Sequence, residues 1–157
     1  MSELRTNKIV PKDGMPSGAS GGGIVQVVYA EQATEVTSST NTYITSGLSA
    51  IIRPSTSSNK VLIIGNLGGC DKRTGNTYMG VSLRRNGVEV YAPEGQALWT
   101  NNTETSSQTV SFQYLDTPGS TSDLTYEVFI ASLANTAQVS VQWSNGRSAI
   151  TLMEVSG

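Results

Sequence analysis

The chain has 157 residues and a formal net charge of −2, and only 14% of its residues are charged, against about 25% in an ordinary soluble domain. This length suits one domain with a core of its own. With so few charges and a slightly negative net charge, the chain has no basic surface to attract a nucleic acid or an anionic membrane. No stretch of the sequence approaches the ~18 consecutive apolar residues of a membrane-spanning helix. We therefore expect no nucleic-acid binding and no membrane insertion.

The inventory of reactive side chains is small. Histidine is absent and Cys70 is the only cysteine, which excludes imidazole metal ligands, histidine-based triads and an intrachain disulfide. A reactive thiolate needs a basic partner, so we expect Cys70 to be inert. The carboxylates are scattered singly, without a pair set out for glycoside hydrolysis or a DxDxDG run for calcium. The sequence thus predicts a protein that is not an enzyme, with no catalytic residues, no cofactor and no metal site.

Residues 1–23 form an N-terminal arm and glycine-rich linker that differ from everything after them. Prolines and glycines between positions 11 and 18 exclude a long helix or a central strand, and the three glycines at 21–23 act as a flexible joint. Such an arm is either a frayed terminus or a segment ordered by a partner. A frayed tail does not require the apolar side chains of Leu4, Ile9 and Val10, so we interpret these three as a partner-docking arm.

From residue 24 to 157 the pattern changes to short apolar runs and period-two alternation, separated by turn signals at intervals of roughly ten residues. Residues 34–36 either extend the first expected strand or pair with it. No helical pattern lies between the strands, so the sequence predicts an all-β domain, an antiparallel β-sandwich of jelly-roll-like type. The expected strands cover residues 24–30, 42–52, 60–67, 77–85, 88–91, 108–115, 124–132, 138–143 and 149–155.

Four local patterns add detail. Gly47 indicates a bulge that resets the alternation of its strand, and Asn86-Gly87 is typical of a type I′ hairpin turn. The unbroken VLII at 61–64 predicts a strand buried on both faces. The glycine-rich stretch 65–75 lacks the GxxxxGK[ST] and GxGxxG patterns of nucleotide loops, so we interpret it as a loop that only connects two strands.

Trp99 stands in a polar, loop-like region, residues 92–107, among asparagines, threonines and a glutamine. An aromatic ring surrounded by amides and hydroxyls resembles a carbohydrate-contacting surface, where the ring face stacks on sugar C–H groups. A lone tryptophan more often anchors its loop by burial. Both interpretations stay open, and Trp99 is the candidate contact if the protein binds a host-surface glycan.

The remaining features favour assembly. A β-domain with a tethered apolar arm is suited to static contacts, in which arm side chains are buried and main-chain groups pair with an open sheet edge. Closed symmetric oligomers are the rule for such modules, and we favour a homotrimer.

Several stretches, in this order along the chain, resemble a group of small β-domain virion proteins and tail-fibre segments of marine tailed bacteriophages, including cyanophages. They are SELRTNKIVPKDG, GGGIVQVV, the paired blocks GLSAIIRPSTSSNKVLIIG and VSFQYLDTPGSTSDLTYEVFIAS, and SAITLMEV. The resemblance implies a jelly-roll-like sandwich and a structural place in the virion, as a tail-fibre-associated, collar or head-decoration component assembled in the host cytoplasm. It implies other virion proteins as partners and brings no catalytic residue with it.

Overall fold

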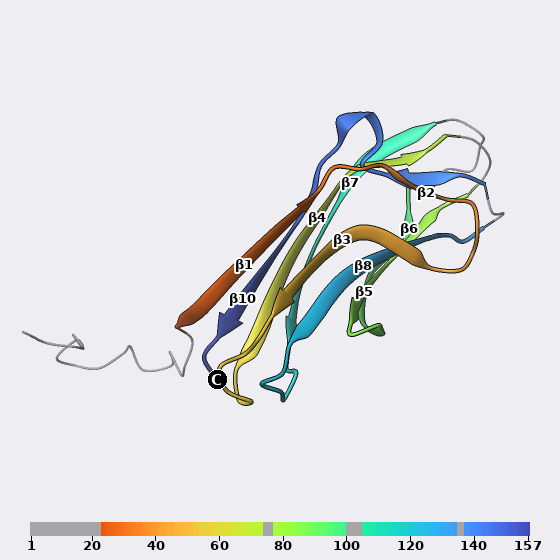
Figure 1. Cartoon of the computed structure of the whole chain (residues 1–157). Helices are drawn as coiled ribbons and strands as arrows, with labels where there is room; N and C mark the ends of the chain where they lie inside the picture. The colour runs from red at the N-terminus through yellow and green to blue at the C-terminus, as the bar shows by residue number, and fades with distance from the viewer. Residues whose placement is uncertain (1–22, 74–76, 100–104, 135–136) are drawn as a thin grey trace, which may run out of the picture.

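The computed structural model describes residues 23–73, 77–99, 105–134 and 137–157 (Figure 1). Alternating apolar side chains give these residues ten strands, because β-branched and aromatic side chains pack well on a pleated surface. One short 3-10 turn, η1 (Trp143–Asn145), separates the last two strands. The strands are β1 (Ile24–Gln32), β2 (Val36–Ser38), β3 (Ile44–Ile52), β4 (Lys60–Lys72), β5 (Met79–Arg85), β6 (Val88–Ala97), β7 (Ser106–Asp116), β8 (Leu124–Ser132), β9 (Val139–Val141) and β10 (Ser148–Val155).

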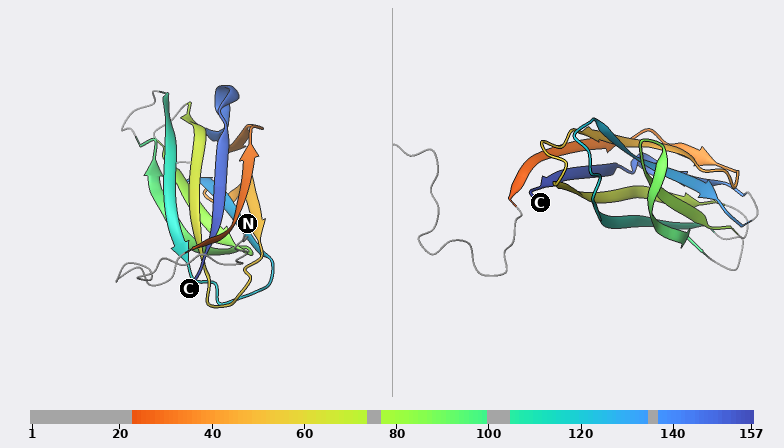
Figure 2. Two further views of the ribbon diagram at one scale, coloured as in Figure 1. Left: turned by 90° about the vertical axis from the view of Figure 1, so that its left-hand side faces the viewer. Right: turned by 90° about the horizontal axis from the view of Figure 1, so that it is seen from below.

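The strands form two packed antiparallel sheets. The first, which we call the β1 sheet, has the order β1–β10–β4–β7, with β9 pairing with the far end of β4 and β2 with β9. The second, the β3 sheet, has the order β3–β8–β5–β6. Figure 2 shows the long strands of the β1 sheet side by side and the β3 sheet behind them. The long strands β1–β10–β4–β7 and β3–β8–β5–β6 are connected in the order of a jelly roll, to which β9 and β2 are added, so the predicted fold class is confirmed.

The core lies between the two sheets. Alternate positions of each long strand point inward, as a period of two requires, and fully buried side chains come from both layers. Each such apolar side chain contributes roughly 1.5–3 kcal/mol relative to leaving it in water. The largest buried apolar side chains are Leu48, Ile52, Ile63, Leu67, Met79, Leu83, Tyr126, Ile130, Ile150 and Leu152.

Two local predictions are confirmed. Gly47 has a φ of 77°, and the register between β3 and β8 shifts between Thr45 and Ser49, which is the predicted bulge. Asn86 and Gly87 have φ values of 50° and 84° and join β5 to β6 in a tight hairpin. Both sites need positive φ, which explains why the sequence signals there are specific.

The predicted loop 65–75 is wrong, because β4 continues through its glycines to Lys72. A Cβ on Gly68 would overlap the backbone carbonyl of Arg147, and one on Gly69, whose φ is 60°, would overlap the backbone of Trp143. The glycines therefore let the connection between β9 and β10 cross β4 at close range. Glycines of this kind have the same composition as a loop, although they belong to a strand.

Three further predictions need correction. The loop-like region 92–107 is shorter than expected, since β6 continues to Ala97 and β7 begins at Ser106. β2 pairs with β9 and not with the first strand. The VLII run is not buried on both faces: Ile63 is fully buried, whereas its neighbour Ile64 is 42% exposed. The reason is that, within the part of the chain that the structure describes, nothing covers the outer side of the β1 sheet.

Candidate functional site

The structure places one of the four site residues expected from the sequence. Leu4, Ile9 and Val10 lie outside the described residues. Trp99 follows the end of β6, and its ring meets that of Tyr78 edge to face, with centroids 5.6 Å apart and an interplanar angle of 76°. The residue is 49% exposed. The ring of Trp99 thus packs against Tyr78 while about half of the residue faces solvent. This placement is consistent with an anchor for its loop and with a contact for a glycan.

Cys70 has the environment of an inert thiol. It is fully buried in β4, and its Sγ donates a hydrogen bond to the carbonyl oxygen of Leu67 at 3.3 Å. Burial raises the pKa of the Cys70 thiol to about 12, so the thiolate is scarce at neutral pH. Among the described residues no three His, Cys, Asp or Glu side chains are grouped to hold a metal ion. In the same residues no helix has the length and apolar character to cross a membrane.

The most distinctive surface is the outer side of the β1 sheet, where apolar side chains gather on four adjacent strands. Six of them are 42–60% exposed, and the other three are partly exposed. Isolated exposed apolar residues are normal, but a contiguous group is informative. We call this group the apolar face; its members are Ile24, Val25, Val27 and Tyr29 on β1, Met153 and Val155 on β10, Leu62 and Ile64 on β4, and Leu115 on β7.

Strand register makes the apolar face continuous. Residues paired directly across neighbouring strands point to the same side of a sheet, so each row of partners forms a line of side chains. One row is apolar across all four strands: Val27, Met153, Leu62 and Leu115. In the next row toward the far end of the sheet, the apolar Tyr29 and Ile64 alternate with the polar Thr151 and Gln113.

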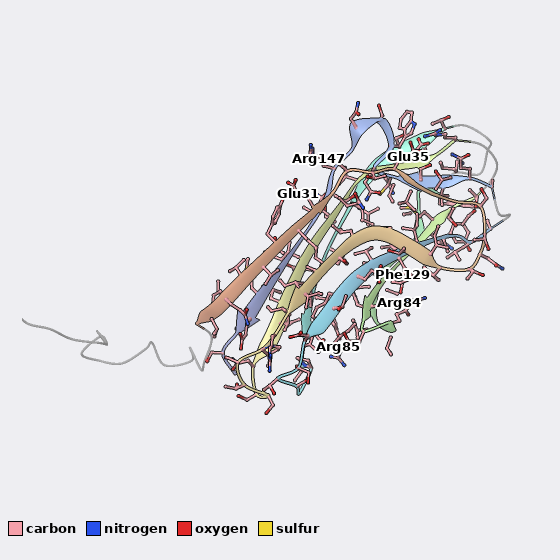
Figure 3. The ribbon with its side chains drawn as sticks, viewed as in Figure 1. Glu31, Glu35, Arg84, Arg85, Phe129 and Arg147 are labelled. Carbon is pink, nitrogen blue, oxygen red and sulfur yellow. The ribbon has the colours of Figure 1, made fainter. Side chains whose placement is uncertain are left out.

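Charged groups stand at the ends of this surface and not within it. Lys60 is exposed at one end, in register with Val155. At the other end Arg147 Nη1 and Glu31 Oε2 form an ion pair at 3.2 Å, and both residues are labelled in Figure 3. The hydroxyl of Tyr29 donates to Glu31 Oε1 at 2.5 Å, which turns its polar tip toward the charged end. The centre of the apolar face is therefore uncharged.

The outer side of the β3 sheet has a different character. Arg84 lies in register with Glu127, and its guanidinium stacks 4.3 Å from the ring centroid of Phe129 and 5.7 Å from that of Tyr43 (Figure 3). Glu127 also accepts a hydrogen bond from the hydroxyl of Thr45 at 2.5 Å. Cation–π stacking of this kind fixes the long side chain flat on the sheet. The two outer sides are thus one apolar and one polar.

A second polar cluster lies where β4 ends. Arg73 stacks over the ring of Trp143 at 5.1 Å and forms ion pairs with Asp71 at 3.0 Å and Glu35 at 2.6 Å. Arg73 covers one side of the indole, and Trp143 is partly exposed. A shallow hollow beside this cluster is lined by Ala33, Glu35, Gln142, Trp143, Ser144 and Asn145.

The end of the domain at which residues 1–22 leave it is held by a buried carboxylate. Glu154 is fully buried in β10; its Oε1 accepts hydrogen bonds from the backbone and hydroxyl of Ser55, both at 2.7 Å, and from the amide of Asn59 at 2.5 Å. Its Oε2 accepts from the amide of Gln26 on β1 at 2.5 Å. Burial by itself raises the pKa of Glu154, but these hydrogen bonds outweigh it and lower the pKa to about 2.

Both ends of the described domain meet at this carboxylate. The backbone N–H of Ser156 donates to the carbonyl oxygen of Gly23 at 3.0 Å, and that of Gly157 donates to Oδ1 of Asn59 at 3.1 Å. Gly23 precedes Ile24, a member of the apolar face. The point from which residues 1–22 emerge is therefore fixed, and it adjoins the apolar face.

Sequence reasoning missed the apolar face, although its signal is present. IVQVVY at 24–29 and VLII at 61–64 are both apolar on consecutive positions. Such runs are typical of strands covered on both sides, and that interpretation assumes a covering element within the same chain. The described residues hold no such element over the β1 sheet.

No family model matches the chain, and no curated protein matches it. Among solved structures, the chain is similar to one of infectious bursal disease virus, Gt strain. The TM-score is 0.48 and the sequence identity is 13%, and the match covers 96% of this chain and 36% of the viral chain. For T=1 particles derived from the same virus, the TM-score is 0.45 and the identity is 14%, and the match covers 94% of this chain and 42% of the viral chain. For Bacillus endospore appendages, a family of disulfide-linked pili, the TM-score is 0.33 and the identity is 18%, and the match covers 88% of this chain and 96% of the pilus chain. The chain spans less than half the length of the viral chains, and all three TM-scores are below 0.5, too low to indicate a shared function.

Proposed function

We propose that this chain is a non-enzymatic structural protein of a bacteriophage virion, related to the small β-domain virion and tail-fibre proteins of marine tailed phages. It serves as a tail-fibre-associated, collar or head-decoration component and is assembled in the host cytoplasm. The arm residues Leu4, Ile9 and Val10 dock on another virion protein, and the β-domain makes contacts between copies. The sequence alone favours a homotrimer, but the apolar face supports a two-fold pair of copies in its place.

The observation that carries this proposal is the apolar face beside the point where residues 1–22 emerge. Exposed apolar surface on this scale is costly for a free monomer and is typical of surfaces that another protein covers. The jelly roll is also an architecture that viral capsid domains use, although the same architecture occurs in lectins and cupins. The resemblance in sequence supports the virion among these.

The test is incorporation into particles. A chain lacking residues 2–20 keeps every residue of the described core, so we expect it to fold and to be absent from purified particles. The matched control replaces the three arm residues Leu4, Ile9 and Val10 together by serine, which keeps the length of the arm. Mass spectrometry of purified particles measures the copy number of each form. Normal incorporation of both variants would contradict the docking role of the arm.

A second candidate function is binding of a host-surface glycan, and the partly open ring of Trp99 is the observation that favours it. In this case the purified protein binds defined glycans on an array, and Trp99→Ala removes the binding. Val88→Ala is a suitable control, since Val88 is 69% exposed and lies outside both the surroundings of Trp99 and the apolar face. Absence of binding by the wild type, or unchanged binding by Trp99→Ala, would contradict this function.

A further inference from the structure

The size of the apolar face is that of a protein interface. Its six most exposed residues are 42–60% exposed. Together they present roughly 600 Å² to solvent, at the upper limit of the ~300–600 Å² patch that a typical monomer carries. With the partly exposed Leu62, Met153 and Val155, the apolar face approaches the about 800 Å² that each partner buries in a standard interface. The area available is thus close to what a stable pair of proteins needs.

The distribution of charge resembles the core and rim of an interface. Interface cores are depleted in charged residues and enriched in aromatic residues and methionine, and their rims are polar. Here Tyr29 and Met153 lie within the apolar face, and Lys60 and the Glu31–Arg147 ion pair lie at its ends. An uncharged centre does not repel an identical copy, so charge does not oppose contact between two copies of this surface.

The margin of the β1 sheet beside the apolar face is also uncharged over most of its length. In the described residues β1 pairs only with β10, and its register shifts at a bulge between Ile24 and Gln26. Natural edge strands are usually protected by bulges, charges or prolines; here the bulge lies at one end and Glu31 at the other, and residues 26–30 carry no charge or proline. The uncharged surface therefore extends from the middle of the sheet to its β1 edge.

The remaining exposed apolar residues determine the symmetry of the contact. Within the described part of the chain, Ile51, Val88 and Trp99 are the other large exposed hydrophobic residues, and they lie on β3, on β6 and beyond the end of β6. None of these forms a second surface that could match the apolar face. A head-to-tail ring needs two different complementary surfaces, whereas a two-fold pair needs only one that matches itself.

We infer that the apolar face is the contact between two copies of this chain, which stack the outer sides of their β1 sheets on a two-fold axis. The inference rests on the proposed function only in that copies of a virion protein are brought together in the particle. It goes beyond that function because it names the surface, the partner and the symmetry. A pair formed in this way uses two β-sheets packed face to face, a geometry that stacked sheets adopt at a spacing of about 10 Å.

The test uses the full chain and light scattering after size exclusion. We expect the wild type to have twice the mass of one chain, and Val27→Lys and Leu115→Lys each to have the mass of one chain. A dimer of either variant would bury two unpaired ammonium groups, one from each copy, which should raise the dissociation constant of the dimer about 100-fold or more. The two substitutions lie on β1 and β7, so a folding defect caused by one of them would not affect the result of the other. Circular dichroism checks that both variants are folded.

Val88→Lys is the matched control, because Val88 is 69% exposed on a strand outside the apolar face. It should keep the mass of the wild type. A monomeric wild type would overturn the inference and leave residues 1–22 or a different protein as the occupant of the apolar face. A trimeric wild type would overturn the two-fold contact, and an oligomer unchanged by both Val27→Lys and Leu115→Lys would show that another surface makes it. None of these results depends on particle incorporation, so the proposed function stands or fails separately.

Discussion

Replacing Glu154 by glutamine tests how the domain holds the end from which residues 1–22 emerge. Glutamine has nearly the same shape, so the core should be unchanged. One side-chain oxygen can still accept from Ser55 and Asn59, but these bonds lose their charge assistance. The new amide nitrogen faces the amide of Gln26, where two donors cannot pair. The substitution therefore removes charge and one acceptor without leaving a cavity.

The expected loss is about 2 kcal/mol of unfolding free energy at pH 7. Hydrogen bonds to a charged group contribute about 1.5–3 kcal/mol each and neutral ones about 1 kcal/mol. The weakening at Ser55 and Asn59 and the lost acceptor for Gln26 together exceed 2 kcal/mol, and relief of the cost of burying a charge offsets part of this sum. The result would be a large fraction of the stability of an ordinary domain.

The pH dependence gives a second, independent check. The pKa of Glu154 is about 2 in the folded chain, against a usual value of 4.5. A carboxyl with a lowered pKa stabilises the folded state fully above its unfolded pKa, and this contribution is lost as the pH falls toward the folded pKa. The difference in unfolding free energy between the wild type and Glu154→Gln should therefore shrink as the pH falls from about 4.5 to 2, because all other groups titrate alike in both chains.

Urea unfolding followed by tryptophan fluorescence, at one protein concentration and at pH values from 7 to 3, measures this difference. Glu31→Gln is the control: Glu31 is exposed, forms a surface ion pair with Arg147 and accepts an exposed hydrogen bond from Tyr29 that glutamine can still accept, so the substitution should cost less than about 1 kcal/mol. A Glu154→Gln chain as stable as Glu31→Gln at pH 7 would refute the role of the hydrogen bonds. A difference that stays constant down to pH 3 would refute the lowered pKa.

Two further outcomes follow from β4. Gly69→Ala should lower the melting temperature markedly, with a loss of about 2 kcal/mol or more, because φ at Gly69 is 60° and the new Cβ would overlap the backbone of Trp143. Gly119→Ala, at a φ of 61° but in open space, should cost only about 1 kcal/mol, and equal losses would contradict the steric explanation. Cys70 should react with a thiol reagent at pH 8 only after unfolding in urea; rapid reaction of the folded chain would contradict its burial.

The parts of the fold that were predictable are those governed by local rules. Period-two alternation identified β8 at Leu124–Ser132, because one side of this strand is buried and the other is not. Asn86-Gly87 identified its turn because few residues accept positive φ at two successive positions. In both cases the chain within a few residues determines the outcome.

The parts that were not predictable depend on segments distant in the sequence. Gly68 and Gly69 are strand residues because the backbone near Arg147 and Trp143 crosses them, and nothing local distinguishes this from a loop. Ile64 was expected to be buried because its run is apolar, but burial depends on what covers the sheet. The candidate site shares this property, since the apolar face exists only when β1, β10, β4 and β7 are set in register.

Electron microscopy of intact particles tests the central claim most directly, because it identifies the neighbours of every copy of this chain. The account predicts that the β-domain occurs in pairs related by a two-fold axis, with Val27, Leu62 and Leu115 buried against the same residues of a second copy, and that the arm contacts another virion protein. Particles that lack the chain, or that contain it with the apolar face open to solvent, would contradict the account.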